Sequence, residues 1–376
     1  VMILPADVEP VTHSVSSTGD ITIANGILSC TISSDGRLRS VVVAATGREV
    51  IGPDEAGRLQ VRRDTPAEYD AWDIDRYDAD AGAVVLTAPE PSFILRADPA
   101  TVQVATSFAH NDSRFRLLWS LSAGSSRLDL RLEADWRGSE ERLQWTVPID
   151  VMARDALCGI QFGHVRRPRH ANTSWDLARF EVCAHRYVYV SEPGCGVALL
   201  ADGPRGYDIR GRNLSLTLLR APRFPDPTCD LGSHSIEWSL LVDSGEGNVS
   251  AVEEEAARVA HPIRLSGRSL VRREESIAVT APGVLVSAVK LAADGSGDLV
   301  VRIWESRGAR SRGTMTVRWR TGPARRCDAL ELPLAENDDT SSVAGDDGRS
   351  EWTAGVGGGT MELDMRPFEI RTYRLT

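Results

Sequence analysis

The stretch RLDLRLEADW, residues 127–136, alternates charged and apolar side chains at every position. Successive side chains of an extended chain point to opposite faces, so the leucines, the alanine and the tryptophan share one face while the arginines and acids share the other. This pattern predicts an antiparallel strand with one face in a core and the other in water. It makes a β protein the starting hypothesis for the whole chain.

Shorter stretches with the same alternation occur on both sides of this one: Ile21–Ile32, Val102–Phe108, Phe115–Leu121, Leu214–Leu218, Leu299–Glu305, Thr314–Trp319, Met361–Met365 and Ile370–Leu375. Turn-forming sequences separate them, and His110-Asn111-Asp112 is interpreted as such a turn rather than as a pair of metal ligands. One segment predicts a helix, with Ser250 as its N-cap, Glu253 as the capping-box partner and Pro262 ending it. The sequence therefore predicts an all-β fold with one convincing helix.

The helix and the loop after it, through Arg273, predict a hinge between two β regions. We expect a large sandwich of two stacked sheets over residues 1–265 and a smaller β-sandwich over residues 276–376. Within the smaller region, the polar, Gly- and Asp-rich segment Glu336–Arg349 predicts a mobile loop.

Composition excludes several classes of function. The 376 residues include 43 Lys and Arg against 53 Asp and Glu, a formal charge of −10, and the acids are scattered among arginines, which argues against a nucleic-acid partner. No apolar run approaches the roughly 18 residues that a membrane-spanning helix needs, so no membrane partner is expected. The six cysteines form no C-x-x-C motif, and mostly reduced cysteines predict a cytoplasmic chain. The opening VMILPADVEP lacks the pattern of a signal peptide and is typical of a chain entered midway.

Three segments concentrate polar and aromatic residues beyond what strands require: Tyr69–Asp75, Gly163–Glu192 and Gly203–His234. The first joins two aromatics to three carboxylates, a combination that suits a sugar, because a ring stacks on its C–H face while carboxylates accept from its hydroxyls. A loop with Trp72 packed inward and solvated aspartates is the alternative. The second segment contains three histidines whose spacing supports a metal site only weakly, and the third contains three prolines within six residues, which predict a rigid loop.

These segments, with several others in the same order, closely resemble the C-terminal β region of glycoside hydrolase family 38 α-mannosidases. The resemblance rests on DAWDID (70–75), RPRHANTSWDLARFEVCAHRYVYVSEPGCGVALL (167–200), GYDIRG (206–211), LSLTLLRAPRFPDPTCDLGSH (214–234), NGILSCTISSDGRLRSVVVAATGREV (25–50), VKLAADGSGDLVVRIWESRGARS (289–311) and PFEIRTYRL (367–375). It covers nearly the whole chain and is closest to the branch that contains bacterial and cytosolic enzymes.

The resemblance implies a large galactose-mutarotase-like β-supersandwich followed by a smaller C-terminal β-sandwich. It also implies that the catalytic N-terminal domain of the parent enzyme is absent from this chain, together with the nucleophile and the ligands of its zinc ion. The parent would hydrolyse α-mannosidic bonds with retention, through a covalent glycosyl intermediate. The expected partners are that N-terminal domain and an α-mannoside, and a homo-oligomer is left open. We expect no cofactor, no metal and no catalytic residue in this chain, which alone should be inactive.

The resemblance also supplies a hypothesis for individual residues. The loops that carry six side chains would face the missing domain and complete the wall of the substrate cleft: Trp72, Asp73, Asp75, Tyr207, Asp208 and Arg220. An arginine can hold a sugar hydroxyl or a catalytic carboxylate. A structural contact between domains is the alternative for each. On this hypothesis Arg220→Ala and Asp73→Ala lower catalytic efficiency in the parent with little loss of stability.

Two other functions remain open at this point. The chain is an autonomous carbohydrate-binding module if Trp72, Trp175 and neighbouring aromatics bind sugar by themselves. It is an aldose epimerase if one cleft holds a general acid and a general base, for which His185 and Glu192 are the nearest candidates. Seven residues separate these two, a spacing that does not obviously bring them together.

Overall fold

The computed structural model describes residues 4–52, 55–243, 248–262, 276–318, 322–334, 352–355 and 357–376. The chain divides into two compact units. The first comprises Val1–Gly159, Val165–Asn248 and Glu255–Pro262, and the second comprises Ile160–His164, Val249–Glu254 and Ile263–Thr376. The predicted hinge loop through Arg273 and the predicted mobile loop Glu336–Arg349 lie outside the described residues.

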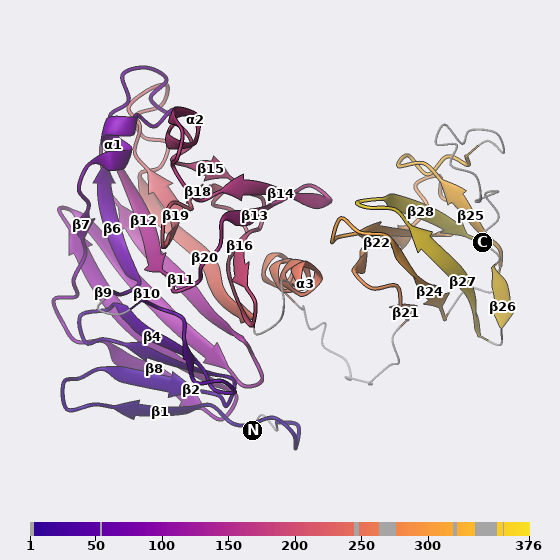
Figure 1. Cartoon of the computed structure of the whole chain (residues 1–376), viewed down its shortest axis with the longest axis horizontal. Coiled ribbons are helices and arrows are strands. Elements are labelled where there is room, and N and C mark those ends of the chain that lie inside the picture. Colours follow the sequence, from indigo (N-terminus) through magenta and orange to yellow (C-terminus); the bar gives the residue numbers. More distant parts are fainter. Residues whose placement is uncertain are drawn as a thin grey trace. The chain divides into compact units, whose positions relative to one another are not determined.

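The described residues of the first unit form sheets of five, nine and six strands (Figure 1). The five-stranded sheet runs in the order β1 (Thr12–Val15), β2 (Ile21–Ala24), β3 (Leu28–Ile32), β4 (Leu38–Val43), β5 (Arg48–Glu49). The nine-stranded sheet runs in the order β14 (Gly163–Pro168), β13 (Asp155–Ile160), β16 (Tyr187–Glu192), β17 (Cys195–Ala201), β20 (Gly232–Asp243), β11 (Arg127–Trp136), β10 (Ser113–Ser122), β9 (Thr101–His110), β8 (Phe93–Asp98). The six-stranded sheet runs in the order β15 (Val182–Cys183), β18 (Gly206–Asp208), β19 (Asn213–Arg220), β12 (Glu141–Pro148), β6 (Arg58–Arg63), β7 (Val84–Val85).

Strand β11 occupies the residues that its alternation predicted, between β10 and β20. Its apolar face is buried, and Leu130 lies opposite Trp119 on one neighbour and Trp238 on the other. The ring of Trp238 also meets that of Trp145 from β12, with centroids 5.9 Å apart, so the nine- and six-stranded sheets share one core. Burying each such large apolar side chain stabilises the fold by about 1.5–3 kcal/mol, which explains why the alternation determines the fold.

Two of the local predictions are refined by the structure. The stretch Ile21–Ile32 forms a hairpin of two strands rather than one, because Gly26 takes a positive φ of 79° and the Asn25 side chain accepts from the backbone N–H of Ile27 and Leu28. The turn interpretation of His110-Asn111-Asp112 is confirmed, since Asn111 joins β9 to β10 with φ 51°.

Three helices are present in the described residues: α1 (Arg76–Asp80), α2 (Ser174–Leu177) and α3 (Val249–Ala260). The predicted helix is confirmed as α3, but the prediction of Ser250 as its N-cap is wrong, because α3 already includes Val249 and a cap must lie just outside the helix. The two short helices were not predicted. A capping box between Thr173 and Asp176 starts α2.

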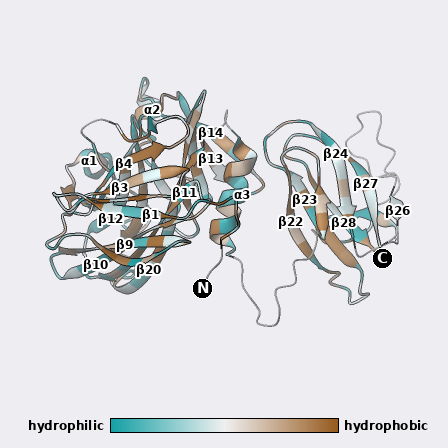
Figure 2. Cartoon of the chain, turned by 90° about the horizontal axis from the view of Figure 1, so that it is seen from below, coloured by the Kyte–Doolittle hydropathy of each residue, from teal (hydrophilic) through white to brown (hydrophobic). Residues whose placement is uncertain are grey.

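In the part of the second unit that the structure describes, the strands form two four-stranded sheets. One runs in the order β21 (Ile277–Val279), β24 (Ser311–Val317), β27 (Gly358–Met365), β26 (Thr353–Gly355), and the other in the order β22 (Val284–Leu291), β23 (Leu299–Glu305), β28 (Ile370–Leu375), β25 (Ala324–Cys327). Their inner faces share a core that includes Met315 and Leu363 from one sheet and Ile303 and Tyr373 from the other. Figure 2 shows apolar and polar residues alternating along strands of each unit.

The predicted fold class is confirmed: the chain is all-β, with a large supersandwich followed by a smaller sandwich. Among the described residues, no helix has the length and apolar character needed to cross a bilayer.

Candidate functional site

Most of the residues proposed from the sequence gather where loops meet at one end of the first unit, near α1 and α2 (Figure 1). We call the segments 64–80, 169–181 and 221–231 the loop rim. The Asp70 carboxylate accepts from the backbone N–H of Phe224 at 2.9 Å, which joins the first segment to the third. Arg210 binds Asp80 at 3.3 Å and lies over the ring of Phe180 at 5.8 Å, which joins the first segment to the second. Side chains therefore hold the three loops together.

Arg220 fixes the shape of the first loop. Its Nε donates to Asp64 Oδ2 at 2.6 Å, and its Nη1 donates to the carbonyl of Ala71 at 3.2 Å. Its Nη2 donates to the carbonyls of Asp70 at 3.1 Å and Asp73 at 2.7 Å. Four of the five N–H donors of the guanidinium are thus directed at this loop. The geometry makes Arg220 a positioning residue for the loop, with at most one donor left for a ligand.

The carboxylate that Arg220 binds lies deep in the protein. The side chain of Asp64 is 1% exposed, against 17% for Arg220. Burial raises the pKa of Asp64, and the hydrogen bond and charge of Arg220 oppose that rise. Removing the guanidinium would leave the carboxylate buried without its counter-charge, so the pair couples the shape of the loop to the stability of the unit.

The outer side of the loop rim carries exposed aromatic rings. Tyr69 and Trp72 are each 67% exposed, Tyr77 is 86% exposed and Phe224 is 65% exposed. We call these four residues the aromatic rim. Exposed apolar groups on adjoining loops are candidates for a binding surface, whereas isolated ones need no explanation. Trp72 does not pack inward, so the sequence alternative of an inward-packed tryptophan is wrong.

The other proposed residues differ in how available they are. Asp73 is exposed, and its carboxylate accepts from the backbone N–H of Ile74 at 2.9 Å. Asp75 is half-buried, and its carboxylate accepts from the backbone N–H of Ala67 at 2.9 Å. Asp208 accepts from the backbone N–H of Arg210 at 3.0 Å and from two of its guanidinium nitrogens, at 3.0 and 2.7 Å. The aspartates therefore support loop structure, and Asp73 is the one that also faces water.

Tyr207 does not join the others at the surface. It is 1% exposed and belongs to the core, because it lies on β18 opposite Leu216, and the alternation places Asp208 on the outer face instead. Burial raises the pKa of its phenol, and its hydroxyl has no hydrogen-bond partner in the described part of the chain.

Beneath the loop rim, the polar face of the six-stranded sheet carries a row of arginines, of which the sequence analysis named only Arg220. The register places Arg62, Arg142 and Arg220 side by side on β6, β12 and β19. Arg142 binds Glu181 at 2.6 Å and is 2% exposed, while burial lowers the pKa of Arg62 and the neighbouring charge of Arg142 lowers it further. The sequence pattern that could have revealed this row is the alternation in RLQVRR at 58–63 and ERLQWTVP at 141–148. The polar positions of each stretch share one face of its strand.

The histidines form no shared site. His170 pairs with Asp176 at 3.3 Å, while Glu192, the proposed partner of His185, instead binds Arg48 at 3.0 Å. Within the described residues, no three or more His, Cys, Asp or Glu side chains converge in a way that fits a metal ion. Glu192 is thus paired with an arginine and not with His185.

Comparison with known proteins agrees with the resemblance seen in the sequence. Residues 23–228 match the model of the glycosyl hydrolases family 38 C-terminal domain, and residues 283–373 match that of the family 38 C-terminal beta sandwich domain. Human alpha-mannosidase 2C1 is 32% identical over 342 residues, which cover 86% of this chain and 32% of that protein. Alpha-mannosidase G of Dictyostelium discoideum is 30% identical over 378 residues, which cover 95% of this chain and 33% of that protein.

A solved structure shares the fold. The crystal structure of an alpha-mannosidase from Enterococcus faecalis V583 superposes with a TM-score of 0.74 at 14% identity, covering 97% of this chain and 43% of that one. The fold and the loop rim define a protein of two β-sandwich units with loops gathered at one end of the larger. Because the first family model covers more than half of the chain, the chain belongs to glycosyl hydrolase family 38, as its C-terminal region. It spans about a third of the length of the curated relatives it matches.

Proposed function

We propose that this chain is the C-terminal part of a retaining, zinc-dependent α-mannosidase, in which it scaffolds the catalytic domain and lends its loop rim to the substrate cleft. The observation that carries the proposal is Arg220, which anchors a loop from below through four hydrogen bonds while Trp72 on the same loop stays 67% exposed. A rigid loop that presents an aromatic ring to solvent is suited to binding, because little conformational entropy is lost when a ligand docks.

Chemistry of the rim supports a sugar as the ligand. The face of Trp72 can stack on the C–H groups of a pyranose, while the exposed carboxylate of Asp73 can accept a hydrogen bond from a hydroxyl. Retaining hydrolysis needs two carboxyl groups about 5 Å apart on either side of the scissile bond. No pair in the rim is assigned to those roles. The proposal places the nucleophile, the acid and the zinc ligands in the catalytic domain, and the chain alone is inactive.

The test compares hydrolysis of an aryl α-mannoside by this chain and by a longer parent polypeptide. In the parent, Trp72→Ala should lower kcat/KM at least about tenfold, the loss expected when one stacking contact of about 1.4 kcal/mol is removed. Phe93→Ala is the matched control, because Phe93 is also an exposed aromatic, 48% exposed, but lies on the edge strand β8. Equal activity of the parent and its Trp72→Ala variant would remove the rim from the cleft. Hydrolysis by the chain alone would refute its inactivity.

A second candidate, an autonomous carbohydrate-binding module, is favoured by the four exposed rings of the aromatic rim. Calorimetric titration of the 376-residue chain with mannose and mannobiose separates the two functions. Binding at micromolar to low millimolar strength that Trp72→Ala abolishes supports a module. The absence of heat supports a scaffold.

A further inference from the structure

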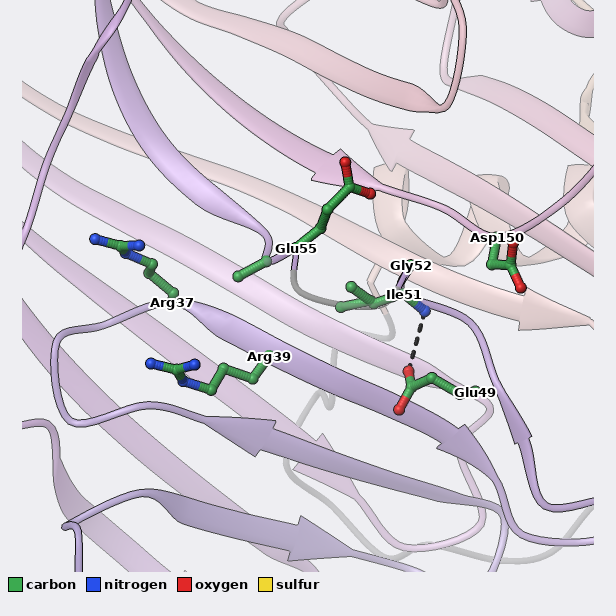
Figure 3. A pocket seen from close by; sticks show the side chains of 8 residues that line it. Arg37, Arg39, Glu49, Ile51, Gly52, Glu55 and Asp150 are labelled. Atoms are coloured by element: carbon green, nitrogen blue, oxygen red, sulfur yellow. Dashed lines mark hydrogen bonds between the residues drawn. The ribbon is translucent and has the colours of Figure 1, made fainter.

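A polar pocket of about 580 Å³ lies in the first unit and is lined by no residue of the loop rim (Figure 3). Arg39, at the start of β4, and Arg37, just before that strand, line it together, and Glu55 and Asp150 line it from two other segments. The volume falls within the range of roughly 300–1,000 Å³ that holds small molecules. Among the described residues that line the pocket none is aromatic, so their recognition of a ligand must be electrostatic.

Two of the carboxylates in the pocket already serve the fold. Glu49 accepts from the backbone N–H of Val41, Val50 and Ile51, at 2.9 to 3.0 Å. Asp150 binds the guanidinium of Arg212 at 2.9 Å. These acids are held in place by their own partners and are not the groups that await a ligand.

The arginines are left with unused donors. Arg37 is paired through Nε with Asp35 at 3.1 Å, which leaves its two terminal nitrogens. Arg39 is exposed and has no hydrogen bond or ion pair in the described part of the chain. Figure 3 shows both guanidiniums extending toward the same side of the pocket. Like charges on one wall repel, and a bound oxyanion would relieve that repulsion with charge-assisted hydrogen bonds.

The backbone at Arg39 is a second observation that points to a site at this pocket. The pairing of β3 with β4 shifts register between Thr31 and Ile32, so Ser40 lies opposite Thr31 and Leu38 lies opposite Ile32. Arg39 is the extra residue of this β-bulge. Bulges re-aim side chains and concentrate beside functional sites. Here the extra residue lets Leu38 face the core together with Val41 and Val43, and the arginines on either side of Leu38 line the pocket.

We propose that this pocket binds a hydroxyl-bearing oxyanion, such as a phosphorylated or carboxylated sugar, through Arg37 and Arg39. Figure 3 places the Glu55 side chain apart from the two arginines along the pocket. The carboxylate of Glu55 makes no hydrogen bond or ion pair within the described residues, although its charge acts on the neighbouring Arg58. In the proposed complex this carboxylate accepts from the ligand's hydroxyl groups. The guanidiniums hold the anionic group, and Glu55 selects a sugar over a bare anion.

Calorimetric titration of the 376-residue chain at low salt tests this proposal with four probes: mannose 6-phosphate, glucuronate, inorganic phosphate and mannose. Binding of one or both sugar anions, weakened by added salt, is expected, and the two sugar arms tell a phosphate ester from a carboxylate. Titration with mannose reports on the loop rim instead. Its outcome therefore bears on the proposed function and not on this pocket.

Variants locate the binding. Arg39→Ala should weaken it about tenfold and the double variant Arg37→Ala/Arg39→Ala should abolish it, because each removes charge-assisted hydrogen bonds. Glu55→Gln should weaken the sugar anion but strengthen inorganic phosphate, since it replaces a charged hydroxyl acceptor with a weaker neutral one and removes a repelling charge. Arg312→Ala is the matched control, because that arginine is 84% exposed in the second unit.

No binding of either sugar anion, or unchanged binding by Arg39→Ala, would overturn the site. Inorganic phosphate that binds as tightly as the sugar anions would overturn the assignment of a sugar.

Discussion

Replacing Arg220 by alanine is the most demanding test of how the loop rim is held. The substitution removes the ion pair with Asp64, whose side chain is 1% exposed, and three hydrogen bonds to loop carbonyls. Breaking a buried pair by deleting one partner costs about 3–5 kcal/mol, because the remaining charge stays buried. We therefore expect the free energy of unfolding to fall by about 3–5 kcal/mol. This reverses the expectation from sequence that Arg220→Ala has little effect on stability.

The assay is urea unfolding followed by tryptophan fluorescence, with limited proteolysis of the native variant to report on the loop of residues 64–75. The variant should unfold at lower urea and be cut faster in this loop. The double variant Asp64→Asn/Arg220→Ala should recover part of the loss, because it leaves no buried carboxylate without its arginine. An Arg220→Ala protein that unfolds at the wild-type midpoint and resists protease equally would refute the claim that Arg220 positions the loop.

The pH dependence gives a second readout of the same pair. Burial raises the folded-state pKa of Asp64 above its ordinary value near 3.8, although Arg220 opposes the rise. A carboxyl with a raised folded pKa contributes stability that is fully present below its unfolded pKa and is lost as pH rises through the folded pKa. Without Arg220 that pKa rises further, so the Arg220→Ala variant should lose stability more steeply than wild type above about pH 4. Parallel pH profiles would contradict this.

Three further outcomes follow from single groups. Tyr207→Phe removes a buried hydroxyl that has no hydrogen-bond partner among the described residues, so the free energy of unfolding should be unchanged or rise by about 1 kcal/mol, and a loss above 1 kcal/mol in urea would show a hidden partner. Hydrogen bonds from Ser296 and Arg374 lower the pKa of Asp294 to about 2. The stability that its carboxylate contributes is therefore present above about pH 4 and is lost toward pH 2. In acid unfolding, the difference in free energy of unfolding between wild type and Asp294→Asn should shrink over that range. Burial raises the pKa of the Cys30 thiol to about 12, so iodoacetamide at pH 8 should label exposed Cys183 in the native chain and Cys30 only after unfolding, as peptide mass spectrometry would show.

Much of the fold could be predicted from the sequence because its cause is local. The alternation in residues 127–136 puts five apolar side chains on one face, and β11 forms over those residues since no other backbone geometry buries that face. The end of a helix is less certain. Ser250 had the right chemistry for a cap, but the structure continues α3 one residue earlier, to Val249.

The candidate site was predictable only in part. The run DAWDID, residues 70–75, pointed to the correct loop, and Trp72 is exposed on it. Tyr207 was chosen with its neighbours in the motif GYDIRG, yet the alternation of β18 turns it into the core. Arg220 was selected as a ligand-binding group, whereas the structure directs its donors to backbone carbonyls about 150 residues away in the chain.

By itself, the sequence determined the class of fold, the family resemblance and the segments where chemistry gathers, because periodicity and motif order are properties of neighbouring residues. Only the tertiary structure decided which polar groups are already satisfied by the protein. Arg220 and Arg39 are both arginines on β-strands, but the first meets the loop of residues 64–75 and the second meets solvent in a pocket. That difference depends on which distant segments fold against each strand, and it separates a residue that holds a site together from one that is free to bind.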